Sequence, residues 1–290
     1  MISLPAEIID GSKIADSIMN TLRDSFKEQQ DKAGKQARLV LILIGKDEGA
    51  STYSRAKIRR GEKLGVRVDL MKPDESISEA ELAVEIGQLA SDPTVTGIMI
   101  ENPVPKHLSF SKMTDLIPFY KDIDGTSSTN QGRIVNRQEF LVPATAAAVV
   151  RILSNYPELT KSILTIVNRT PVVGRPLSQM LLNRDYTISV CHSKTPDVVI
   201  YTRRSDVVIS AVGKPNYFDD EMINPDCTFI DVGINYVDGK VTGDANYQSL
   251  VKWVKRITPV PGGVGPITAT LIFENLLKAF NYQNLNSGKM

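Results

Sequence analysis

One stretch decides the fold: Ile163-Leu164-Thr165-Ile166-Val167-Asn168-Arg169-Thr170-Pro171-Val172-Val173-Gly174-Arg175-Pro176-Leu177. Its apolar, β-branched beginning is typical of a buried strand, and the polar turn after it leads into the start of a helix. The start of a helix that follows a buried strand is a place where proteins hold phosphate groups. Only Gly174 offers an unhindered backbone, while Asn168 can adopt left-handed geometry at some cost. The motif alone therefore leaves a phosphate site and a structural turn equally open.

The same alternation of strand, loop and helix extends in both directions from this stretch. We expect buried strands at Leu39–Ile44, Val66–Met71, Gly97–Ile100, Ser162–Val167, Tyr186–Cys191, Asp206–Val212 and Cys227–Val232. Helices are expected from Asp10, from near Ser51, through Ala80–Leu89, over Thr145–Leu153 and after Pro266, with a glycine-punctuated loop around Gly233, Gly239 and Gly243. This order predicts an α/β fold with largely parallel sheets. We expect two lobes: an N-terminal α/β domain of residues 1–143, completed by a C-terminal helix within 267–290, and a Rossmann-like domain of residues 144–266.

Composition limits the possible partners. The chain has 290 residues, of which 42% are hydrophobic, so it can bury a sizeable core. Its formal charge of +1 gives no overall field for nucleic acid or an anionic membrane, which favours a small-molecule ligand. Two cysteines are too few for a disulfide scaffold, and the first residues do not form a secretory signal, so a cytoplasmic protein is expected. Two histidines in unrelated positions predict no metal site.

The ends of the first two strands of the second lobe indicate which dinucleotide binds. Arg169 follows the first strand, where a guanidinium can hold the 2′-phosphate of NADP; otherwise it is a solvated surface arginine. Ser193 and Lys194 follow the second strand, where an NAD enzyme usually places a carboxylate on the ribose. A hydroxyl and a cation suit a phosphate better, so NADP is favoured over NAD.

Several blocks, in order, resemble the bifunctional methylenetetrahydrofolate dehydrogenase/methenyltetrahydrofolate cyclohydrolase family over essentially the whole chain. They are Ser51-Thr52-Tyr53-Ser54-Arg55-Ala56-Lys57, Gly97-Ile98-Met99-Ile100-Glu101-Asn102-Pro103-Val104-Pro105, Lys121-Asp122-Ile123-Asp124-Gly125, Gly174-Arg175-Pro176, His192-Ser193-Lys194-Thr195, Asp231-Val232-Gly233-Ile234-Asn235 and the loop Pro259–Pro266. Each block is modest alone, but their order and spacing are not expected by chance.

The resemblance implies a site and a reaction. It implies that Tyr53 packs on the folate, that Lys57 handles protons and that Asp124 binds the pterin ring, with Glu101 beside the lysine. Without the surrounding blocks these would be a core tyrosine, a surface lysine and a turn aspartate. The implied cofactor-binding residues are Asn168, Arg169, Thr170, Gly174, Ser193, Gly213, Ile234 and Thr268. The implied reaction oxidises 5,10-methylenetetrahydrofolate to the methenyl form in a folate-binding homodimer.

Glu101 is the departure from the family that bears most on activity, because the family usually has glutamine there. Cyclohydrolase chemistry needs a group that takes a proton from the attacking water, so some of Lys57 must be neutral. A carboxylate beside the lysine favours its ammonium form. We therefore expect a weak or absent cyclohydrolase, while the same negative charge can stabilise the cationic methenyl product.

Other departures leave alternatives open. Pro143-Ala144-Thr145-Ala146-Ala147-Ala148 lacks a cysteine that the family commonly has, Ser54, Arg59 and Arg60 replace more usual residues, and Asn168 with Arg169 resembles the NAD-specific branch, so NAD remains possible. Three competing interpretations are a fully bifunctional enzyme with Glu101 protonated or turned away, a non-catalytic folate- or nucleotide-binding paralogue, and a Rossmann dehydrogenase for another small substrate.

Overall fold

A computed structural model describes residues 5–46 and 48–286 of the chain. These residues form two compact units. The three-stranded unit contains Ser17–Ala144 and the residues from Ala269 onward, and the six-stranded unit contains the residues up to Asp16 together with Thr145–Thr268. The expected assignment of all of 1–143 to the first lobe differs from this division, because strand β1 (Glu7–Ile8) pairs with β11 (Arg256–Ile257) in the six-stranded sheet.

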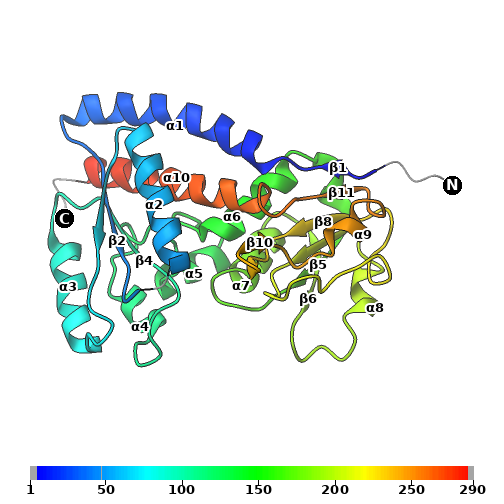
Figure 1. The fold of residues 1–290 in the computed structure, drawn as a ribbon. Coiled ribbons are helices and arrows are strands. Elements are labelled where there is room, and N and C mark those ends of the chain that lie inside the picture. Colours follow the sequence, from blue (N-terminus) through cyan, green and yellow to red (C-terminus); the bar gives the residue numbers. More distant parts are fainter. Residues whose placement is uncertain (1–4, 47, 287–290) are drawn as a thin grey trace. The chain divides into compact units, whose positions relative to one another are not determined.

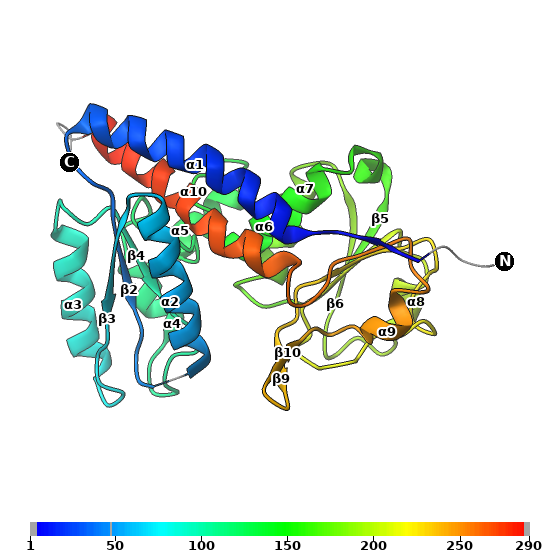
Figure 2. The same ribbon diagram turned by 45° about the horizontal axis from the view of Figure 1, so that its top comes forward.

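The three-stranded unit is built on a parallel sheet in which β2 (Arg38–Ile42) lies between β3 (Arg67–Met71) and β4 (Gly97–Ile100). The sequence of β2 is an unbroken apolar run after Arg38, as expected for a strand with both faces covered. The helices of this unit are α2 (Glu48–Lys63), α3 (Glu79–Ser91), α4 (Phe110–Asp115), α5 (Ser128–Val135) and the greater parts of α1 (Gly11–Ala33) and α10 (Val264–Leu285). Both views show α1 running beside α10 (Figure 1 and Figure 2).

The six-stranded unit is a parallel sheet in the order β1-β11-β8-β7-β5-β6. Its remaining strands are β5 (Ile163–Val167), β6 (Thr187–Cys191), β7 (Val207–Ser210) and β8 (Thr228–Asp231), and its helices are α6 (Ala144–Ser154), α7 (Gly174–Leu182), α8 (Val199–Thr202) and α9 (Tyr247–Leu250), with a 3₁₀ turn at Pro157–Lys161. The strand order reverses at β5, which lies between β6 and β7. In open parallel sheets the carboxyl ends of the strands at such a reversal are where ligands bind.

One predicted loop is a hairpin. The segment punctuated by Gly233, Gly239 and Gly243 contains the antiparallel strands β9 (Asn235–Val237) and β10 (Lys240–Thr242). Asp238 and Gly239 both have positive φ in the turn between them, the two-residue turn that matches the twist of a hairpin.

The α/β class with parallel sheets is confirmed. Among the described residues, no helix is long and apolar enough to cross a membrane.

Candidate active site and cofactor site

Helix α2 carries the two residues expected to meet the folate. Tyr53 and Lys57 lie four residues apart, so they share one side of the helix. Their surroundings differ, because Tyr53 is 39% exposed whereas Lys57 is 6% exposed. The helix therefore presents an accessible aromatic ring one turn before a buried ammonium group.

The Lys57 ammonium is paired with Glu101, which directly follows β4. Lys57 Nζ lies 2.8 Å from Glu101 Oε1 and 2.6 Å from Oε2, so both carboxylate oxygens accept from the same nitrogen. Glu101 is 4% exposed. A buried carboxylate and a buried ammonium in such contact compensate each other's charge, and removing one partner leaves the other uncompensated. Two of the residues that the sequence predicted for the site, Lys57 and Glu101, are therefore in direct contact.

Ser54 is a third buried member of this cluster. Its hydroxyl is fully buried and lies 3.1 Å from Glu101 Oε1 and 2.9 Å from the carbonyl oxygen of Ala50 one turn earlier. The sequence comparison treated Ser54 and Glu101 as separate departures from the family, whereas the structure puts them in contact.

Asp124 lies near this pair on the loop after β4. Its carboxyl group is half-buried. Burial raises the pKa of Asp124 to about 7; Asp122 and Glu101 add to the rise, and Lys57 opposes it. The electrostatic influence of both Lys57 and Glu101 on this carboxyl group means that three of the expected site residues share one environment. A carboxyl group here can accept hydrogen bonds from N–H donors once it is ionised.

Two buried residues that the sequence reasoning did not assign hold the Asp124 loop in place. Asp122 accepts hydrogen bonds from Ser127 N and Asn130 Nδ2, each at 2.9 Å. Asn275, on α10, donates through Nδ2 to the carbonyl oxygens of Ile123, at 2.9 Å, and Val142, at 2.8 Å. Asp122 belongs to the Lys121–Gly125 block, so family resemblance had already marked its position. Asn275 had no local signal, because its partners are 152 and 133 residues away.

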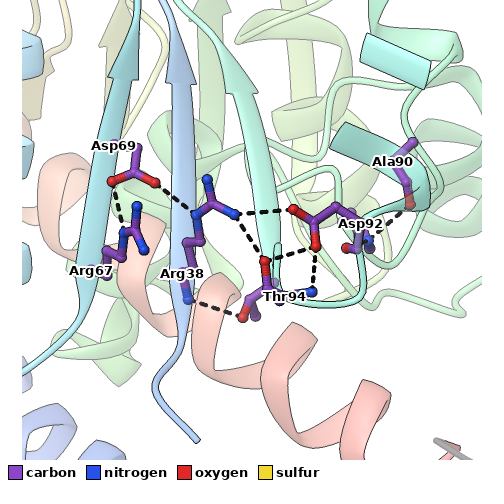
Figure 3. Close-up of polar contacts among 8 residues, drawn as sticks. Arg38, Arg67, Asp69, Ala90, Asp92 and Thr94 are labelled. Atoms are coloured by element: carbon purple, nitrogen blue, oxygen red, sulfur yellow. Dashed lines mark hydrogen bonds and ion pairs between the residues drawn. The ribbon is translucent and has the colours of Figure 1, made fainter. Parts of the chain in front are cut away.

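The amino ends of the same strands carry a separate polar network (Figure 3). Arg38 donates to Asp69 at 2.7 Å and to Asp92 at 3.1 Å, which links the segments around β2, β3 and β4. Lys121 Nζ donates to the carbonyl oxygens of Ala90 and Asp92, each at 2.8 Å. Lys121 of the Lys121-Asp122-Ile123-Asp124 block therefore anchors the chain through two backbone carbonyls, while Asp124 of the same block belongs to the site.

In the six-stranded unit, Asn168 organises the turn between β5 and α7. Its Oδ1 accepts from Thr170 N at 2.8 Å, Thr170 Oγ1 at 2.8 Å and Gly174 N at 2.9 Å, while its Nδ2 donates to Ala211 O at 2.6 Å. Asn168 does not adopt the left-handed backbone that is open to it, because it is not among the described residues with positive φ. Its side chain instead ties the end of β5 to the end of β7, where the strand order reverses.

Gly174 allows this turn to close. A Cβ at position 174 would lie 2.2 Å from the carbonyl oxygen of Asn168, closer than any side chain tolerates. Gly174 is also the first residue of α7. The turn therefore brings a helix N-terminus against the end of a buried strand, which is the arrangement that holds phosphate groups in α/β proteins.

Arg169 and Ser193 occupy equivalent places on neighbouring strands. In the register of β5 and β6, Val167 pairs with Cys191. Arg169 follows Val167 by two residues and Ser193 follows Cys191 by two residues, so both lie at the carboxyl edge of the sheet. Both side chains are exposed. The segment after β6 folds on itself, because Thr195 Oγ1 accepts from His192 N at 2.9 Å and His192 Nδ1 accepts from Lys194 N at 3.1 Å. A guanidinium and a hydroxyl can thus meet a phosphate here.

Gly213 and Ile234 lie on two further loops at this edge, after β7 and β8. Gly213 has φ +71°, and Ile234 is 45% exposed. Thr268 lies on another element, α10, where its hydroxyl donates to Val264 O at 3.2 Å. The helix begins at Val264, earlier than expected. Arg169, Ser193, Gly213 and Ile234 therefore gather at one edge with the Asn168 turn, and Thr268 stands on the helix after the glycine-rich loop.

Comparison with known proteins identifies the family of the chain. A family model described as the tetrahydrofolate dehydrogenase/cyclohydrolase catalytic domain matches residues 9–124, and one described as the NAD(P)-binding domain of the same enzymes matches residues 143–284. The bifunctional protein FolD of Thermoplasma acidophilum is 51% identical over 97% of this chain and 99% of its own length. That of Thermoplasma volcanium is 48% identical over 99% of this chain and all of its own length.

Solved structures give the same result. The crystal structure of the bifunctional 5,10-methylenetetrahydrofolate dehydrogenase/cyclohydrolase from Thermoplasma acidophilum matches with a TM-score of 0.90 and covers 97% of this chain and 100% of that one. A Trypanosoma brucei dehydrogenase–cyclohydrolase, complexed with NADP cofactor and an inhibitor, matches with a TM-score of 0.92 at 29% identity, over 99% of this chain and 100% of that one. Residues, fold and relatives agree, and the chain belongs to the tetrahydrofolate dehydrogenase/cyclohydrolase family.

Proposed function

We propose that this protein oxidises 5,10-methylenetetrahydrofolate to 5,10-methenyltetrahydrofolate with NADP as the hydride acceptor, and that its cyclohydrolase step is weak. The contact of Lys57 with both oxygens of Glu101 carries the second part of the proposal. The three-stranded unit would bind the folate, and the six-stranded unit would bind the cofactor. We also propose a homodimer, on family resemblance alone, which sedimentation of the purified protein tests.

The residues of the three-stranded unit suit the oxidation. Ionised Asp124 can accept hydrogen bonds from the N–H groups of a pterin, and the exposed Tyr53 ring can pack on a planar ring system. Loss of a hydride from the methylene carbon leaves a cation shared with the two folate nitrogens. A negative charge on Glu101 close to that cation would stabilise it, which favours the forward direction.

The six-stranded unit suits the cofactor. The Asn168–Gly174 turn places the N-terminus of α7 beside the carboxyl end of β5, and a helix N-terminus in that position favours a phosphate group. Exposed Arg169 and Ser193 at adjacent strand ends offer a cation and a hydroxyl for a 2′-phosphate. NADP, when bound, accepts the hydride at its nicotinamide ring. The NADP complex of the Trypanosoma brucei relative supports the same choice.

Hydrolysis of the methenyl product makes a different demand on Lys57. Water must attack the methenyl carbon and give up a proton, and an amine can accept that proton only when it is neutral. In the buried pair, both carboxylate oxygens of Glu101 accept hydrogen bonds from Lys57 Nζ. The Ser54 hydroxyl lies 3.1 Å from one of these oxygens. Both contacts hold the carboxylate against the Lys57 nitrogen. The pair therefore opposes general-base catalysis by Lys57.

A second candidate function is the complete bifunctional enzyme, which makes 10-formyltetrahydrofolate. The relatives at 51% and 48% identity are named as bifunctional, which favours it. Under this alternative Glu101 would itself hold the proton, leaving Lys57 neutral inside the same contact.

Two assays separate the candidates. Initial rates of methylenetetrahydrofolate oxidation with NAD and NADP, side by side, test the dehydrogenase and its cofactor. The decay of methenyltetrahydrofolate absorbance, with and without enzyme, tests the hydrolysis. We expect NADP-dependent oxidation with decay close to the buffer rate. Decay well above that rate would establish the bifunctional alternative, and ligand binding without oxidation would indicate a non-catalytic paralogue.

A further inference from the structure

The carboxylate of Asp244 is a buried charge to which neither proposed reaction assigns a role. The residue is fully buried. Its Oδ2 accepts from Ser210 Oγ at 2.7 Å and Val212 N at 2.6 Å, and its Oδ1 accepts from Lys214 N at 3.0 Å and Asn235 Nδ2 at 3.1 Å. A carboxylate has room for about four such donors, so its capacity is filled.

Two of the four donors lie on the loop after β7, and the other two are the last residue of β7 and the first residue of β9. Val212 and Lys214 flank Gly213 on the loop after β7, and Asn235 directly follows Ile234 on the loop after β8. Gly213 sits in the left-handed region, at φ +71°, between the two backbone N–H groups that bind the carboxylate. One side chain therefore fixes the distance between the two loops and the direction of the Gly213 peptide groups.

A second carboxylate, that of Asp231 at the end of β8, fixes Asp244 itself. Asp231 accepts from the backbone N–H groups of Asp244 at 3.1 Å and Ala245 at 2.8 Å. The backbone approaches closely on the other side, because a Cβ at Gly233 would lie 2.3 Å from Asp244 Cγ. The Asp244 carboxylate thus has one available position.

We propose that Asp244 is a positioning residue for the dinucleotide, acting through Gly213 and Ile234, which it holds at the carboxyl edge of the sheet. The inference rests on the proposed function, because it assumes that these two loops contact the cofactor. Backbone groups that bind a ligand are effective only when their geometry is fixed in advance, and displacements of about 1 Å weaken such sites strongly.

The substitution Asp244→Asn keeps the shape and removes one acceptor. Whichever way the amide is turned, its NH₂ group faces either Val212 N or Lys214 N, so one backbone N–H loses its partner. Ser210 and Asn235 can reorient, whereas a backbone N–H cannot. We expect the Kd for NADPH, measured by fluorescence titration, to rise about tenfold, with the KM for NADP rising in parallel and kcat changing less than about threefold.

Matched variants complete the test. Asp238→Asn, on the exposed hairpin turn of the same unit, should leave the Kd unchanged. Asn235→Ala removes one of the four donors and should give a smaller rise than Asp244→Asn. Gly233→Ala presses on the carboxylate without changing its charge, and it should reproduce the weaker NADPH binding. Folate affinity and the thermal midpoint are measured as well. Both should stay unchanged if a variant affects cofactor positioning alone.

Three results would overturn the inference, and they are distinguishable. Wild-type protein that does not bind NADPH would remove the proposed function and this inference with it. Wild-type binding with an unchanged Kd in Asp244→Asn and Gly233→Ala would remove the inference alone. Equal losses of NADPH affinity, folate affinity and thermal midpoint would show that Asp244 supports the fold in general rather than the cofactor loops.

Discussion

Buried carboxylates in the two units are compensated in different ways. In the three-stranded unit, Glu101 faces the ammonium of Lys57. In the six-stranded unit, Asp231 and Asp244 are surrounded by backbone N–H groups, a hydroxyl and an amide. An ammonium group can give up its proton, whereas a backbone N–H keeps its proton at any ordinary pH. The comparison teaches that the partner of Glu101 can itself exchange a proton, whereas the backbone donors around Asp231 and Asp244 keep theirs and are suited to holding loops.

Removing the cation is the strongest test of this contrast. In Lys57→Met, Glu101 stays buried without its partner, and we expect the free energy of unfolding to fall by about 3–5 kcal/mol. Because Lys57 is also the proposed proton-handling group, no enzyme-dependent hydrolysis should remain. Urea unfolding and the two assays measure these effects.

The double variant Lys57→Met with Glu101→Leu should regain most of the stability and none of the activity, because no buried charge is left. Lys32→Met, in the exposed Glu28–Lys32 pair, is the matched control and should unfold as the wild type does. A double variant no more stable than Lys57→Met would mean that charge compensation is not what the pair provides.

Replacing the carboxylate tests the direction of the proton effect. Glu101→Gln keeps a hydrogen-bond acceptor for Lys57 and removes the negative charge, so a neutral amine becomes easier to form. We expect methenyltetrahydrofolate hydrolysis to rise roughly 10- to 100-fold, with the oxidation rate unchanged or lower. Stopped-flow absorbance resolves both. An unchanged hydrolysis rate would favour the bifunctional alternative, with Glu101 already protonated.

Asp124 gives a smaller effect with a defined pH range. Because burial raises the pKa of Asp124 to about 7, the folded protein keeps the proton longer than the unfolded chain, in which aspartate titrates near about 3.9. Stability is therefore lost as the pH rises from about 4 to about 7. At pH 8 the free energy of unfolding of Asp124→Asn should exceed that of the wild type by about 1–3 kcal/mol. At pH 3.5 the two free energies of unfolding should be equal.

Folate binding should follow the opposite trend at this site. The pterin N–H groups need the ionised carboxylate, so wild-type affinity should increase as the pH rises through 7, and Asp124→Asn should bind weakly at every pH. Titration of folate binding between pH 6 and 8 checks this. A pH-independent affinity would argue that Asp124 does not accept from the pterin.

The smallest effect is expected from Ser54→Ala, which removes a single contact to the Glu101 carboxylate. We expect a loss of about 1 kcal/mol in unfolding free energy and a hydrolysis rate a few-fold above wild type. In the Glu101→Gln background the same substitution should have no effect on hydrolysis. A double-mutant cycle measures this coupling, and additivity would mean that the two residues act independently.

Apolar runs predicted the strands of the three-stranded sheet closely, and the match is best for β4, whose four residues are all buried. The strand expected at Gly97–Ile100 is β4, and Val66–Met71 differs from β3 by one residue. Two-residue strands such as β1 and β11 have no length over which a period can be recognised. The β9–β10 hairpin did carry a signal, the Asp238-Gly239 turn, which the glycine count around it obscured.

The site was predictable where family resemblance assigns the residue a role and unpredictable where it does not. Lys57 and Glu101 were expected as neighbours by family resemblance. The role of Ser54 in the same cluster depends on a contact across 47 residues. Asp244 and Asn275 lie outside every block that resembles the family, and their partners are 30 or more residues away in most of their contacts. No local pattern identifies such residues.

The short pairing of β1 with β11 has a consequence for synthesis of the chain. Glu7 matches Arg256 in this register, and Arg256 Nε also donates to Glu7 Oε2 at 3.0 Å, across 249 residues. A ribosome adds Glu7 to the chain 249 residues before Arg256, so β1 has no partner strand while the residues between them are added. Open edges invite pairing with other chains. Glu7 is charged and exposed, and it keeps this strand polar until β11 has been made.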